Sequence, residues 1–61
     1  MNKSKFVIYK DKAGYYRWRL RARNGEIVAI SEAYVAKQSA INSAGRVKLI
    51  AWEAEIVDIA K

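Results

Sequence analysis

The sequence predicts an α+β fold in a single domain, residues 1–61: an antiparallel three-stranded meander, one helix packed on one face, and a fourth strand. Three observations predict this fold. Apolar and polar residues alternate through most of residues 5–32, as in half-buried strands. Two turn signals, DKAG and NG, divide that stretch into KFVIYK, YYRWRLRAR and EIVAISE. The apolar spacing then changes to three and four residues, which is typical of a helix.

The first turn allows two strand registers. A four-residue loop over residues 11–14 would set Phe6 opposite Arg19. A three-residue loop ending in Gly14, with this glycine in the left-handed position of a bulge, pairs apolar with apolar residues instead. We predict the second register, whose pairs are Phe6 with Leu20 and Ile8 with Trp18.

The dipeptide Asn24-Gly25 predicts the second hairpin. Between two alternating runs it favours a two-residue type I′ loop, which needs positive φ at both positions. The predicted pairs are Arg23 with Glu26, Ala22 with Ile27, Arg21 with Val28, Leu20 with Ala29, and Arg19 with Ile30.

These registers give the sheet two faces. The core face is predicted to carry Phe6, Ile8, Tyr16, Trp18, Leu20, Ala22, Ile27 and Ala29. The other face is predicted to carry Val7, Tyr9, Tyr15, Arg17, Arg19, Arg21, Arg23, Glu26, Val28 and Ile30. The second face is mixed, because it is neither fully polar nor fully apolar.

A helix is expected from about Ala36 to Ile50, without a capping box at its start. Gly45 lies inside it and has two interpretations: a tolerated surface glycine, or a close backbone approach to a neighbour. The predicted buried face is made by Ala40, Ile41, Ala44, Val47, Lys48 and Ala51.

The segment from Ala54 to Ile59 is rich in β-branched residues and alternates, which predicts the fourth strand. A strand that follows a helical crossover should run parallel to the preceding strand. It must therefore find an edge of the same small sheet, or in a dimer add to the sheet of a partner.

Length and composition limit the possible functions. A chain of 61 residues has a marginal core, and without Cys or His it has no disulfide, no thiolate metal site and no imidazole, so oligomerisation is the remaining source of stability. The net charge of +6 favours anionic partners. No apolar run approaches the roughly 20 residues of a membrane span, and MNKSK leads directly into a strand, so we expect a cytoplasmic protein without membrane contact.

Catalytic signatures are missing from the sequence. The six acids have no spacing typical of acid–base pairs, and the serines have no histidine to activate them. The three glycines are too far apart to cradle a phosphate together. We therefore expect no enzyme activity, no cofactor and no metal.

One constellation has possible chemistry: the arginine row, which is Arg17, Arg19, Arg21 and Arg23. Alternate residues on a strand lie about 6.6 to 6.8 Å apart, close to the spacing of phosphates in an extended nucleic-acid strand, and tyrosines offer stacking faces. Two other interpretations stay open: arginine stems that cover apolar neighbours while their heads are solvated, or a protein contact. The candidate binding residues are Arg17, Arg19, Arg21, Arg23, Tyr9 and Tyr15.

The stretch FVIYKDKAGYYRWRLRARNGEIVAISEAY resembles the signature of the YegP-like family of small uncharacterised proteins. The motifs are an aromatic strand ending in Tyr-Lys-Asp, a Gly before Tyr-Arg-Trp-Arg-Leu, the Asn-Gly turn, and Ser-Glu-x-Tyr before a Lys. The likeness extends over about residues 5–59. It implies one βββαβ unit that forms a homodimer by exchanging the C-terminal strand, and it implies no established activity.

Two positions depart from the family pattern. Trp52 stands where the family often has Pro, which affects the hinge into the exchanged strand. Ala36 stands where the family has Ser or Thr, so the helix lacks an expected N-cap.

The leading functional hypothesis is a non-enzymatic homodimer whose arginine-rich sheet face binds an anionic partner. Single-stranded nucleic acid is the most concrete candidate, and an acidic protein is another. The alternative is a structural or protein–protein interaction module with no nucleic-acid role.

Overall fold

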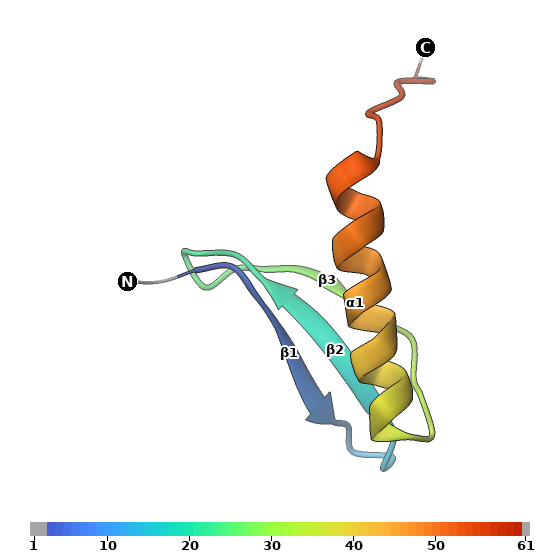
Figure 1. Ribbon diagram of the computed structural model, residues 1–61. Helices are drawn as coiled ribbons and strands as arrows, with labels where there is room; N and C mark the ends of the chain where they lie inside the picture. The colour runs from blue at the N-terminus through green and yellow to red at the C-terminus, as the bar shows by residue number, and fades with distance from the viewer. Residues whose placement is uncertain (1–2, 61) are drawn as a thin grey trace.

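The computed structural model describes residues 3–60 and contains a three-stranded antiparallel sheet beside one long helix (Figure 1). The elements are β1 (Lys5–Lys10), β2 (Tyr16–Arg21), β3 (Ile27–Ile30) and α1 (Lys37–Glu53). The strand order is β1-β2-β3, and α1 contacts β2 and β1. The α+β meander with one helix on one face is confirmed.

The register predicted for the first hairpin is confirmed. Phe6 lies opposite Leu20, and Ile8 lies opposite Trp18. The turn is closed by the N–H of Gly14, which donates to the carbonyl of Asp11 at 3.0 Å, and Gly14 has φ of +91°. An L side chain is strained at this φ, so glycine is the residue that fits the bulge.

The turn predicted for the second hairpin is wrong. The N–H of Gly25 donates to the carbonyl of Ala22 at 2.9 Å, and the N–H of Ala22 donates to the carbonyl of Glu26 at 2.8 Å. Within residues 3–60 only Gly14 and Gly25 have positive φ. The second loop therefore has three residues, like the first. A three-residue loop needs positive φ at Gly25 only, whereas a two-residue type I′ loop would also need positive φ at Asn24, where a side chain makes that conformation unfavourable.

The longer loop shifts the pairing of β3. Leu20 still lies opposite Ala29 and Arg19 opposite Ile30, but Arg21 lies opposite Ile27 and not opposite Val28. Val28 is the extra residue of a β-bulge. Ile27 consequently shares the face of Arg21, and its predicted place on the core face is wrong.

The core lies between β2 and α1. Trp18, Ala40 and Ala44 are the buried hydrophobic residues of the part of the chain that the structure describes, with exposed fractions of 6%, 0% and 7%. Phe6 meets the Trp18 ring edge to face, at 5.1 Å between centroids. Two small alanines let the helix approach the sheet closely enough to cover the indole.

The buried face of α1 differs from the prediction. Ser43 lies in it, since its Oγ receives hydrogen bonds from Trp18 Nε1 at 3.0 Å and from the Tyr34 hydroxyl at 2.8 Å. Three residues predicted for this face are exposed: Ile41, at 40%, Lys48 and Ala51. The helix also continues to Glu53, three residues past the predicted end, and Ala36 at its start makes no side-chain cap.

Replacing Gly45 by Ala is expected to stabilise the domain by about 1 kcal/mol, because alanine has the higher helix propensity. A Cβ built at Gly45 meets no atom within 4 Å in the single chain, which agrees with the surface-glycine interpretation. The melting temperature should rise by about 4–8 °C. The matched control, Gly14→Ala, should lower it because of the positive φ; a lower value for Gly45→Ala would instead indicate a neighbour from a second chain.

The predicted fourth strand does not form within the single chain. Residues 54–60 carry no regular structure and are exposed. The backbone leaves the helix at Ala54 in an extended conformation, and the segment continues beyond the end of α1, away from the sheet (Figure 1). An edge of the chain's own sheet is therefore not its position, and exchange with a partner stays a prediction.

Candidate functional site

The candidate residues of β2 lie on the sheet face opposite the helix. Trp18 points toward α1, as its hydrogen bond to Ser43 requires. Successive strand residues point to opposite faces, so Arg17, Arg19 and Arg21 point away from the helix. Their partners across the β1–β2 pairing are Tyr9, Val7 and Lys5 respectively. We call Tyr9, Arg17, Arg19 and Arg21 the arginine face.

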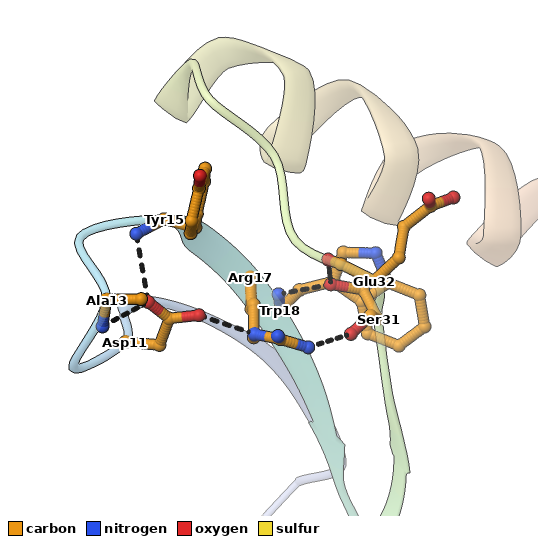
Figure 2. Close-up of polar contacts among 7 residues, drawn as sticks. All are labelled: Asp11, Ala13, Tyr15, Arg17, Trp18, Ser31 and Glu32. Carbon is orange, nitrogen blue, oxygen red and sulfur yellow. Dashed lines mark hydrogen bonds and ion pairs between the residues drawn. The ribbon is translucent and has the colours of Figure 1, made fainter.

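Arg17 is engaged within the chain. Its Nε donates to Asp11 Oδ2 at 2.7 Å, and its Nη1 donates to the Ser31 carbonyl at 3.0 Å, as Figure 2 shows. The side chains of Arg17 and Asp11 are 33% and 18% exposed. Arg17 therefore joins β2 to the first turn and to the end of β3, which is a structural role.

Asp11 organises the first turn. Its Oδ1 accepts hydrogen bonds from the backbone N–H groups of Ala13 and Tyr15, at 3.0 and 2.9 Å (Figure 2). The hydrogen bond from Arg17, followed by that from the Tyr15 N–H, lowers the pKa of the Asp11 carboxyl below its ordinary value. The same ion pair raises the pKa of Arg17.

This lowered pKa predicts a loss of stability in acid. Because the folded-state pKa is below that of the unfolded chain, the stabilisation is complete above about pH 4 and is lost as the pH falls through the folded value. Between about pH 4 and pH 2, the urea midpoint for unfolding of Asp11→Asn should change less than the urea midpoint of the natural protein. Glu32→Gln, at an exposed acid without an ion pair in residues 3–60, is the control, and parallel acid curves for all three proteins would contradict the prediction.

Arg19 is positioned by an aromatic ring. Its guanidinium carbon lies 4.0 Å from the centroid of the Tyr9 ring, a stacked cation–π contact. Its Nε is buried and has no hydrogen-bond partner among residues 3–60. Its stem runs between Val7 and Ile30, the residues opposite it on the two neighbouring strands. The stem therefore covers apolar neighbours, while the stack fixes the orientation of the charged group.

The other candidates are separated by the fold. Arg21 and Arg23 are exposed. Within residues 3–60, neither of them forms an ion pair, in contrast to Arg17. Arg23 belongs to the second turn, so it continues the row around the end of the sheet. Tyr15 is 43% exposed, and Figure 2 shows its ring pointing away from the Arg17 guanidinium. Tyr15 is thus not brought together with the arginine face.

Sequence reasoning missed three contributors. The sequence places Asp11 in a turn but does not indicate its contact with Arg17. It also does not assign Lys5 to a face, although Lys5 lies opposite Arg21. Ser31 is 8% exposed; its Oγ accepts from the Trp18 N–H at 2.9 Å and donates to the Glu32 carbonyl at 2.7 Å. The available signal was the Ser-Glu motif directly after β3, whose first residue ties β3 to β2.

Residues 3–60 contain no group of three Asp, Glu, His or Cys side chains placed to hold a metal ion. None of the helices formed by these residues has the length and apolar character to cross a membrane.

Comparison with known proteins identifies the family. The family described as "Domain of unknown function (DUF1508)" matches residues 11–58. The chain belongs to the DUF1508 family. A UPF0339 protein of Agrobacterium fabrum is 50% identical over 54 residues, which are 88% of this chain and 87% of that protein. A UPF0339 protein of Methanosarcina acetivorans is 46% identical, over 88% of this chain and 93% of its own length. The resemblance to the YegP-like family is confirmed, since it is the same family.

Two solved structures have a similar fold. The solution structure of a protein from Haloferax volcanii is 41% identical, with a TM-score of 0.81 over 95% of this chain and 98% of that one. That of a protein from Agrobacterium tumefaciens is 48% identical, with a TM-score of 0.75 over 92% and 90%. The family's description and the names of these relatives state no activity.

Proposed function

We propose that this DUF1508 protein is a non-enzymatic, homodimeric binding module whose arginine face contacts an anionic partner, with single-stranded nucleic acid as the most concrete candidate. The observation that carries the proposal is the stack of Arg19 on Tyr9, on a sheet face that α1 leaves uncovered. A guanidinium held flat on a ring loses little side-chain entropy when it binds a phosphate, and its fork of N–H groups fits phosphate oxygens.

Charge supports this choice of partner. The chain has a net charge of +6, and Arg21 and Lys5 lie opposite each other at one end of the arginine face, both exposed. Like charges placed opposite each other on adjacent strands are destabilising unless something neutralises them. A polyanion following β2 would meet Arg19 and Arg21 at about 6.6 to 6.8 Å spacing.

The homodimer is supported by the small core and the exposed apolar surface. Residues 3–60 bury three hydrophobic side chains, two of them alanines. Large apolar side chains of the helix end and the C-terminal segment are exposed instead: Leu49, Ile50, Trp52, Ile56, Val57 and Ile59. Large exposed apolar side chains gathered in one part of the chain favour an association site. The same surface favours the second candidate function, a protein–protein interaction module without a nucleic-acid role.

Fluorescence anisotropy of labelled single-stranded RNA and DNA tests the binding proposal. Binding is expected in the micromolar range at about 50 mM salt and should weaken steeply by about 200 mM, because phosphate contacts release counterions. Arg19→Ser/Arg21→Ser should weaken binding at least about tenfold. The slope of the logarithm of the binding constant against the logarithm of the salt concentration should become shallower by about 0.7 for each phosphate that the variant no longer neutralises.

The matched control is Lys37→Ser/Lys48→Ser, which removes the same charge from exposed positions on α1. It should change the affinity about twofold or less, since distant exposed charges are screened. Equal losses in both double variants would reduce the effect to net charge and contradict a specific face. If the natural protein binds no polynucleotide but retains an acidic protein in a pull-down experiment, the second candidate function would be favoured.

A further inference from the structure

A cationic hollow lies at one end of the sheet, between the start of β1 and the second turn. Its volume is about 200 Å³, and its lining includes Lys3, Lys5, Arg21 and Arg23 with no acidic residue. These cations come from three separate parts of the chain: the N-terminal end of β1, the end of β2 and the turn. We call this site the turn hollow.

The backbone forces these charges together. The β1–β2 register sets Lys5 directly opposite Arg21, and the three-residue loop adds Arg23 two positions later. The loop itself is firmly built, since Asn24 Oδ1 accepts the N–H of Glu26 at 3.0 Å. The turn that bounds the hollow is therefore part of the folded hairpin, and the cationic side chains that line the hollow are exposed.

No carboxylate of residues 3–60 neutralises the turn hollow. The ion pair found in this part of the chain joins Arg17 and Asp11, beside the first turn at the opposite end of β2. Glu26, the acid nearest to the second turn in sequence, is exposed and does not line the hollow. Four cations from three segments thus surround one small space without a counter-charge from the chain.

We propose that the turn hollow binds a terminal phosphate of a single-stranded nucleic acid that lies along the arginine face; this inference rests on the proposed function. Arg21 belongs to both sites, so a strand that follows β2 reaches the hollow at its end. A phosphodiester inside a chain carries one negative charge, whereas a phosphomonoester carries about −1.5 to −2 near neutral pH. The denser charge of the hollow matches the monoester, and its size admits one phosphate group.

The test compares one single-stranded sequence carrying a 5′-phosphate, a 3′-phosphate or hydroxyl groups at both ends, each labelled away from the phosphate. A phosphate at one of the two ends should raise the affinity about tenfold, as expected for charge-assisted hydrogen bonds. Lys5→Ser/Arg23→Ser should abolish this gain. Because both residues lie beside the arginine face, the hydroxyl-ended strand should bind more weakly to this variant but should still bind through Arg19 and Arg21. Lys37→Ser/Lys48→Ser, with the same loss of charge, should retain the gain.

The outcomes separate this inference from the proposed function. Equal affinities for the three strands, with strand binding intact, would overturn the turn hollow and leave the arginine face in place. If no strand binds, titration with inorganic phosphate at millimolar concentration decides: amide shifts at Lys5, Asn24 and Gly25 that disappear in Lys5→Ser/Arg23→Ser support a phosphate site. The absence of such shifts overturns it.

Discussion

Trp18→Ala is expected to unfold most of the protein at 25 °C. Trp18 is the one large side chain among the buried hydrophobic residues of the described chain, and it is 6% exposed. It holds Phe6 in edge-to-face contact and donates to Ser43, which joins β1 and α1 to β2. Truncating a buried Trp costs about 3–5 kcal/mol. At about 0.05–0.15 kcal/mol per residue, the stability of a domain this small is of the same order.

Circular dichroism with urea titration measures this effect. Trp18→Phe is the informative control, because it keeps an aromatic ring against Phe6 and removes the N–H that Ser43 accepts. It should fold, with a free energy of unfolding that is lower by about 1–3 kcal/mol and a correspondingly lower urea midpoint. Trp18→Ala with the unfolding midpoint of the natural protein would contradict the place of the indole at the centre of the core.

The strand order and the first register could be predicted because two independent requirements agreed. The three-residue loop used the left-handed tolerance of Gly14 and also set Phe6 against Leu20. At the second turn the sequence held one requirement only, a glycine after Asn24. Both a two-residue and a three-residue loop satisfy it, and the bulge at Val28 that accommodates the longer loop has no distinct residue pattern.

The site was predictable as a face but not as a set of contacts. Alternation along β2 placed three arginines on the side away from Trp18, and the structure agrees. Alternation cannot indicate that the turn residue Asp11 reaches Arg17, or that Tyr9 takes Arg19, since both contacts depend on the paths of side chains between strands. These contacts divide the row: Arg17 stabilises the fold, Arg19 is stacked on Tyr9, and Arg21 is exposed.

Charge is distributed unevenly along the chain. Residues 53–60 contain three of the six acids and no Lys or Arg, whereas eleven of the twelve cations precede them. The acidic segment also carries Ile56, Val57 and Ile59, which are exposed beyond the end of α1. A segment that is apolar and acidic complements a basic sheet with open edges at β1 and β3. These properties support the proposed exchange of the segment between two chains.

Val57→Ser/Ile59→Ser is therefore expected to convert the proposed homodimer into single chains. These side chains are 70% and 87% exposed in the single chain, and burying each against a partner contributes about 1.5–3 kcal/mol. Losing about 3 kcal/mol or more should raise the dissociation constant at least about 100-fold. Sedimentation equilibrium over a range of protein concentrations gives that constant directly.

Ala54→Ser/Ala60→Ser alters the same segment without removing a large apolar side chain, and it should leave the dimer nearly unchanged. The acidic groups add a second signature: salt should weaken the dimer of the natural protein if Glu55 and Asp58 face basic residues of the partner. A natural protein that sediments as a single chain at about 100 μM, far above the dissociation constants of specific dimers, would contradict the exchange outright. The exposed segment would then be the contact for a different protein, and the second candidate function would take precedence.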